Sequence, residues 1–149
     1  MLHNAGYPVR IVDVRYDPTP LETAYRECLA DSDVVGIATF EDNYPFLEGL
    51  IAELKNARPN LPIILGGSLV TSVPHVFMRE TRADVAVISE GELTILELMD
   101  AFAQGAWSWR LPEIKGIWYR DAQGLVHRNL PRGQMKDLES LPVMNLDLW

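Results

Sequence analysis

Short runs of aliphatic and β-branched residues alternate with amphipathic segments along roughly the first hundred residues of this chain. The strand-like runs are residues 9–14, 33–40, 62–65 and 85–88. Between them, apolar residues recur three and four positions apart, which is the pattern of a helix with one buried face. This alternation predicts an α/β fold in which a parallel sheet carries helices on both faces.

Three helical patterns are strong. The first follows the turn at Pro18 and Pro20, the second ends before Pro59, and the third ends at Gly105. Their apolar positions are Leu21, Ala24, Tyr25, Cys28 and Leu29, then Leu47, Leu50, Ile51 and Leu54, then Ile95, Leu98, Met99 and Phe102. A further helix is expected near Pro74, because proline suits the first turn of a helix.

The pattern changes after Pro112. Residues 114–120, the turn 121–124 and residues 125–128 are typical of a β-hairpin, and residues 131–149 of a connecting arm. We therefore divide the chain into an α/β domain, residues 1–112, and a hairpin with a linker, residues 113–149.

The N-terminal residues 2–7 look like the end of a helix that runs into a turn. Four parallel strands are expected where folds of this kind usually have five. This count suggests that the first strand of the usual domain, with most of its helix, is missing before residue 1.

The bulk composition narrows the possible partners. With 149 residues, 48% of them hydrophobic, the chain suits one globular domain with a small appendage. The formal net charge of -8 would on average repel nucleic acid and anionic membranes, which argues against either as a partner. No apolar run approaches the ~18 residues of a membrane span, and the N-terminus lacks the features of a secretory signal, so we expect a cytoplasmic protein.

A single cysteine, Cys28, excludes an internal disulfide and a multi-thiolate metal site. Its place on an apolar helical stripe indicates a buried structural thiol.

Two loops mark the expected ligand site, because open α/β sheets bind ligands where their strands end. Gly66 and Gly67 follow the third strand-like run, and lacking Cβ atoms they let a ligand approach the backbone closely. Ser68 and Thr71 add hydroxyl groups, and Pro74 begins the next helix. An ordinary tight turn between strand and helix is the alternative.

The second loop contains Ser89, Glu90, Gly91 and Glu92 at the start of a helix. Carboxylates here disfavour a polyphosphate and suit a neutral ligand rich in amides, although the helix dipole alone would also favour them. A third loop at the same edge supplies Thr39, Phe40 and Glu41. The aromatic side chains of Phe40 and Tyr44 can pack on a flat ligand or simply on the loop.

Several blocks along the chain resemble, in their order, the N-terminal cobalamin-binding domain of cobalamin-dependent radical S-adenosylmethionine enzymes. The blocks are residues 5–13; Gly66 and Gly67 with Thr71 and Pro74; Gly91 and Glu92 with Thr94 and Glu97; residues 115–124; and residues 137–142. They cover nearly the whole chain.

The resemblance implies a flavodoxin-like, Rossmann-like sheet with cobalamin across its carboxyl edge. It also implies a radical S-adenosylmethionine domain in cis after residue 149, with an iron-sulfur cluster and S-adenosylmethionine bound there. The parent enzyme would be a methyltransferase or a related carbon-skeleton enzyme, and the module alone would be inactive. The residues expected to contact cobalamin are Thr39, Phe40, Glu41, Gly66, Gly67, Ser68, Thr71, Pro74, Ser89, Glu90, Gly91 and Glu92.

No catalytic residue and no cobalt ligand is predicted in this chain. His3 and Gly6 match only the His-x-x-Gly part of the cobalt-ligating motif Asp-x-His-x-x-Gly, and Met1 stands where the aspartate belongs. His75 and His127 are expected at the surface. The resemblance is to enzymes that commonly leave the lower cobalt face without histidine.

Two other classes of function remain open from the sequence. One is a receiver-like module that uses the same edge for a partner protein, although Asp13, Asp33 and Asp84 are scattered where a receiver clusters its aspartates. The other is a module that binds a flavin or a sugar nucleotide. A missing strand would also make a strand-swapped homodimer possible.

Overall fold

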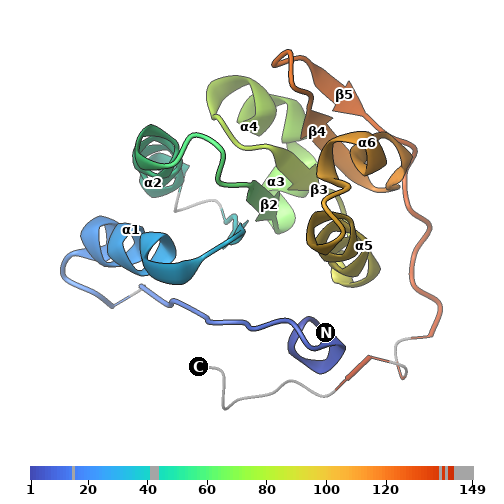
Figure 1. Cartoon of the computed structure of the whole chain (residues 1–149), viewed down its shortest axis with the longest axis horizontal. Coiled ribbons are helices and arrows are strands. Elements are labelled where there is room, and N and C mark those ends of the chain that lie inside the picture. The colour runs from blue at the N-terminus through green and yellow to red at the C-terminus, as the bar shows by residue number, and fades with distance from the viewer. Residues whose placement is uncertain (15, 41–43, 138, 140, 143–149) are drawn as a thin grey trace.

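The structure is a computed structural model that describes residues 1–14, 16–40, 44–137, 139, 141 and 142. Its centre is one sheet of five strands in the order β1-β2-β3-β4-β5 (Figure 1). Strands β1 (Val35–Ala38), β2 (Ile63–Gly66) and β3 (Val85–Val87) are parallel, as the alternating pattern predicts. β4 (Ile117–Arg120) runs antiparallel to β3, and β5 (Val126–Arg128) antiparallel to β4.

Helices cover both faces of this sheet, which confirms the predicted fold class. The helices are α1 (Pro20–Asp31), α2 (Tyr44–Ala57), α3 (Ser68–Ser72), α4 (Pro74–Glu80), α5 (Glu92–Ala103) and α6 (Trp107–Arg110), with 3-10 turns η1 (His3–Ala5) and η3 (Leu111–Glu113). Ile63 and Leu65 of β2 face the core that α1, α2, α3 and α4 build, whereas Ile64 faces the core of α5 and η3. The alternation follows from the two-residue period of a strand.

The prediction of a strand over residues 9–14 is wrong. These residues form no strand, so the sheet has three parallel strands instead of four. β1 is the edge strand on this side, and residues 9–14 do not pair with it, so their backbone forms no ladder hydrogen bonds. The segment runs along α1 instead, where Arg10 pairs with Glu27 and Val14 packs against the core (Figure 1).

The hairpin is confirmed, and β4 joins it to the main sheet. Asp121 shapes its turn, because one carboxylate oxygen accepts hydrogen bonds from the backbone N–H groups of Gln123 and Leu125. Gly124 has φ 82°, a left-handed conformation that favours glycine. The hairpin therefore extends the sheet beyond β3 as antiparallel strands.

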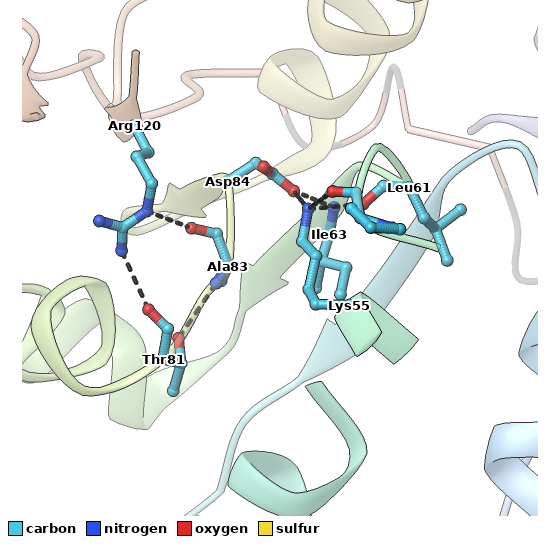
Figure 2. A network of polar contacts seen from close by, with 8 residues as sticks. Lys55, Leu61, Ile63, Thr81, Ala83, Asp84 and Arg120 are labelled. Atoms are coloured by element: carbon cyan, nitrogen blue, oxygen red, sulfur yellow. Dashed lines mark hydrogen bonds and ion pairs between the residues drawn. The ribbon is translucent and has the colours of Figure 1, made fainter. Parts of the chain in front are cut away.

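A polar network at the opposite end of the strands ties α2, β2 and β4 to the loop between α4 and β3 (Figure 2). The Lys55 ammonium of α2 donates to Asp84 Oδ2 at 2.7 Å and to the Leu61 carbonyl at 2.8 Å, and the Ile63 N–H donates to the same Asp84 oxygen. Arg120 of β4 donates to backbone carbonyls of Ala83 and Thr81 between α4 and β3. These contacts hold the strands in register at the end away from the predicted site.

Candidate functional site

The loops after β1 and β2 meet at the carboxyl edge through Thr39 and the glycine pair. Thr39 is fully buried; its N–H and its hydroxyl both donate to the Gly66 carbonyl, at 2.7 and 2.9 Å, and its hydroxyl oxygen accepts from the Val70 N–H. Gly67 has φ 109°, and a Cβ there would lie 2.6 Å from the Thr39 carbonyl oxygen. Thr39 and Gly67 thus build the turn, and the hydroxyl of Thr39 is engaged within the protein.

Gly66, unlike Gly67, has room for a side chain. It has no positive φ, and a Cβ built on it would meet no atom within 4 Å. Nothing within the described fold therefore requires glycine at position 66. The open space above this backbone is what a closely approaching ligand needs.

A hydrogen bond joins helix α3, which follows β2, to the loop after β3. The Ser89 N–H donates to Thr71 Oγ1 at 3.0 Å. Ser89 has φ 66°, the left-handed region that residues other than glycine seldom adopt. Such backbone strain concentrates where a loop is held for binding, so this bond supports a functional role of the edge.

The carboxylates of the β3 loop have different surroundings. Glu90 Oε2 accepts from the Met135 N–H of the C-terminal arm at 2.7 Å. Glu92 begins α5, and its Oε2 is buried with no hydrogen-bond partner among the described residues. Buried polar atoms in native proteins are nearly always paired, so this oxygen is suited to accept from a ligand donor.

The remaining predicted residues take varied positions. Ser68 is exposed at the start of α3, Pro74 is half-buried at the start of α4, and Phe40 is 55% exposed. Glu41 lies outside the described residues. Tyr44 belongs to the core, where its ring packs edge-on against Phe77 with centroids 5.3 Å apart and burial raises the pKa of its hydroxyl. Phe40 is therefore the exposed aromatic side chain of this loop among the described residues.

Lys55, Cys28 and His127 have structural surroundings away from this edge, and His75 lies at the surface. Lys55 is buried, and its three N–H groups point at Asp84 and at the carbonyls of Pro59 and Leu61. Burial raises the pKa of the Cys28 thiol, which suits a structural cysteine. His75 is exposed, and His127 Nε2 lies 2.6 Å from Asp121 on the hairpin.

Sequence reasoning missed the role of the arm at this edge. Arg132 binds Glu97 and Thr94 of α5, which brings residue 135 to Glu90. Thr94 and Glu97 belong to the blocks of the resemblance, but no pattern in the sequence paired them with an arginine some 35 residues away. Across the described residues, no helix has the length and apolar character needed to cross a bilayer.

Comparison with solved structures supports the fold. The cobalamin-bound radical S-adenosylmethionine methyltransferase TsrM from Kitasatospora setae superposes with a TM-score of 0.71 and 19% identity, over 95% of this chain and 26% of that one. The cobalamin-dependent S-adenosylmethionine radical enzyme OxsB, with aqua-cobalamin and S-adenosylmethionine bound, superposes with a TM-score of 0.68 and 20% identity. The match covers 86% of this chain and 18% of that one.

Sequence comparison identifies the family. The uncharacterized methyltransferase PH0819 of Pyrococcus horikoshii is 36% identical over 121 residues, which are 79% of this chain and 25% of that protein. The chain thus spans about a quarter of the length of this relative. The B12 binding domain family matches residues 1–99, that is 99 of 149 residues. The chain belongs to the B12-binding domain family.

Proposed function

We propose that this chain is the cobalamin-holding module of a radical S-adenosylmethionine enzyme, a methyltransferase or a related carbon-skeleton enzyme. The observation that carries the proposal is the carboxyl edge itself. Gly66 presents open backbone there, and Glu92 presents a buried carboxylate oxygen without a partner among the described residues. A flat ligand whose rim carries amide N–H donors fits both features.

Within this proposal, each residue has a separate task. Gly66 admits the ligand to the backbone, while Gly67 and Thr39 hold the turn in place. Thr71 holds Ser89, and thereby fixes the loop that leads to Glu92 at the start of α5. When bound, cobalamin supplies a cobalt centre that can carry a methyl group; the protein binds and orients the corrin. The radical chemistry and the substrate belong to a further domain of the parent enzyme.

Titration with hydroxocobalamin tests cobalamin binding. We expect the visible spectrum of the corrinoid to shift and the melting temperature of the protein to rise with corrinoid concentration, because a ligand that binds only the native state stabilises it. Flavin mononucleotide and a sugar nucleotide serve as the comparison ligands. A melting temperature that rises with either of these, and not with hydroxocobalamin, would contradict the proposal.

The parent activity needs the full-length enzyme. We expect S-adenosylmethionine to be consumed by the full-length protein with its iron-sulfur cluster, and by neither the cluster domain without this module nor this module alone. Consumption that is indifferent to corrinoid would overturn the assignment of the module to that reaction.

A strand-exchanged homodimer of the chain is a second proposal, and the edge of β1 supports it. Val35 and Thr39 donate their N–H groups toward β2, so the backbone of Gly36, between them, points away from the sheet. An uncharged edge strand is a site for pairing with another chain. Light scattering should report a dimer, and a strict monomer at all concentrations would refute this pairing.

A further inference from the structure

The arm after the hairpin is anchored to the protein before it reaches the site. The Asn129 side chain donates to the carbonyls of Leu111 and Ile114, each at 2.7 Å, and the Gly116 N–H donates to the Leu130 carbonyl at 2.8 Å. From there the chain continues past α5 (Figure 1). The first residues of the arm therefore have a defined path.

Arg132 then locks the arm onto α5. Its guanidinium forms two parallel hydrogen bonds with the Glu97 carboxylate, at 2.9 and 2.7 Å, and its Nε donates to Thr94 Oγ1 at 2.8 Å. Thr94 is fully buried and the Arg132 side chain is only 19% exposed. Paired hydrogen bonds of this kind specify geometry as well as adding stability.

The backbone opposite Arg132 is adapted to this contact. Gly116 has φ 79°, and a Cβ there would lie 3.0 Å from the Arg132 Cβ. A larger residue at position 116 would push the arm away. The fit shows that the arm is packed against the loop before β4 as well as against α5.

Three residues beyond Arg132, the arm reaches the predicted site. The Met135 N–H donates to Glu90 Oε2 at 2.7 Å. Glu90 lies in the loop that carries Glu92, whose Oε2 has no partner among the described residues. Among the described residues, the hydrogen bond from Met135 to Glu90 thus connects the arm beyond Arg132 with the loop at the carboxyl edge.

We infer that residues 129–135 form a wall of the cofactor site, with Arg132 as the positioning residue that holds this wall and, through Met135, sets the Glu90 loop. The inference rests on the proposed function, because it names the arm as part of the same site. It assigns no chemistry to Arg132. Releasing the arm is expected to weaken cofactor binding while leaving the sheet intact.

The test compares R132Q with R128Q, which changes an arginine on the neighbouring strand β5 that stacks on Trp118. Two measurements need no cofactor: the exchange rate of the Met135 amide, and cleavage after the exposed Lys136 by a lysine-specific protease. Both rates should rise about tenfold in R132Q, because a tenfold rise corresponds to a loss of about 1.4 kcal/mol of local stability. Both should stay unchanged in R128Q.

The third measurement is affinity for hydroxocobalamin. It should fall about tenfold in R132Q, equally in E97A, and no further in the double variant, because both changes break one contact. R132K retains the charge without the paired geometry and should lie between wild type and R132Q. If R132Q fails to melt cooperatively, the three measurements are made on R132K instead.

The outcomes separate the two proposals. If the arm loosens in R132Q and corrinoid affinity is that of the wild type, the arm is no wall of the site and the cobalamin proposal stands. If the Met135 amide exchange rate and the cleavage rate after Lys136 are unchanged in R132Q, Arg132 does not hold the arm on α5 and the inference fails. If the wild type binds no corrinoid, the proposed function falls and the wall with it, whatever the arm does.

Discussion

Thr71 of α3 and Ser89 of the loop after β3 are linked at the carboxyl edge, because the Ser89 N–H donates to the Thr71 hydroxyl oxygen at 3.0 Å. Ser89 keeps a left-handed backbone there, φ 66°, without being glycine. Such a conformation costs about 1–3 kcal/mol and persists only where neighbouring contacts enforce it. The hydrogen bond is therefore part of what shapes the predicted site.

Replacing Thr71 with valine should release this loop. T71V keeps the side-chain shape but removes the acceptor, which leaves the Ser89 N–H without its partner at a cost of about 1 kcal/mol. We expect a lower free energy of unfolding in urea and hydroxocobalamin binding weaker by several fold. T71S retains the hydroxyl and should resemble the wild type; equal behaviour of T71V and T71S would show that the bond is unimportant.

Replacement by alanine should destabilise the protein at Gly67 but not at the adjacent Gly66. G67A places a Cβ 2.6 Å from the Thr39 carbonyl oxygen at φ 109°, so it should destabilise the fold by about 2 kcal/mol or more. G66A meets no atom within 4 Å, so the free energy of unfolding should stay within about 0.5 kcal/mol of the wild type.

Corrinoid binding separates the glycine variants further. A methyl group on residue 66 would project into the space proposed for the ligand, so G66A should weaken hydroxocobalamin binding about tenfold despite its normal stability. Unchanged affinity in a stable G66A would place the corrin elsewhere.

Breaking the buried pair of Lys55 and Asp84 should destabilise the protein without touching the site. The atoms lie 2.7 Å apart, and the Lys55 side chain is 6% exposed. K55M leaves Asp84 without its cation, and D84N weakens the acceptor; since Asp84 is a quarter exposed, we expect a loss of about 2–3 kcal/mol for each. Additive losses in the double variant would argue against a direct interaction.

Acid should weaken the hairpin through Asp121. The hydrogen bond with His127, then those with the Leu125 and Gln123 N–H groups, hold the pKa of this carboxyl below its ordinary value of 3.8. A lowered folded-state pKa adds stability above the unfolded pKa, and that stability is lost as the pH falls through the folded value.

The D121N variant removes that pH dependence. Between about pH 5 and about pH 2, the free energy of unfolding should fall less steeply in D121N than in the wild type. D31N, which changes an exposed aspartate at the end of α1, is the control and should keep the wild-type slope. An equally steep fall in D121N would contradict a role for Asp121.

Strands β1, β2 and β3, the strong helices and the hairpin were all predictable from local sequence. Each carries its own periodicity or turn signal, and burial on the sheet follows from that period. Residues 9–14 carry the same kind of signal yet form no strand, because in the fold they contact α1 and the core rather than the open edge of β1. The arm was missed for the related reason that Arg132 meets Glu97 only in the folded state.

The fold class, the family and the edge of the sheet where the glycines and carboxylates gather can be read from the amino-acid sequence, because these depend on residue spacing along one chain. Three further properties emerge only from the folded protein: Gly67 is needed for packing while Gly66 faces open space, Glu92 has an oxygen with no partner among the described residues, and the arm reaches Glu90. Those properties depend on distances between residues far apart in the chain, and only folding establishes such distances.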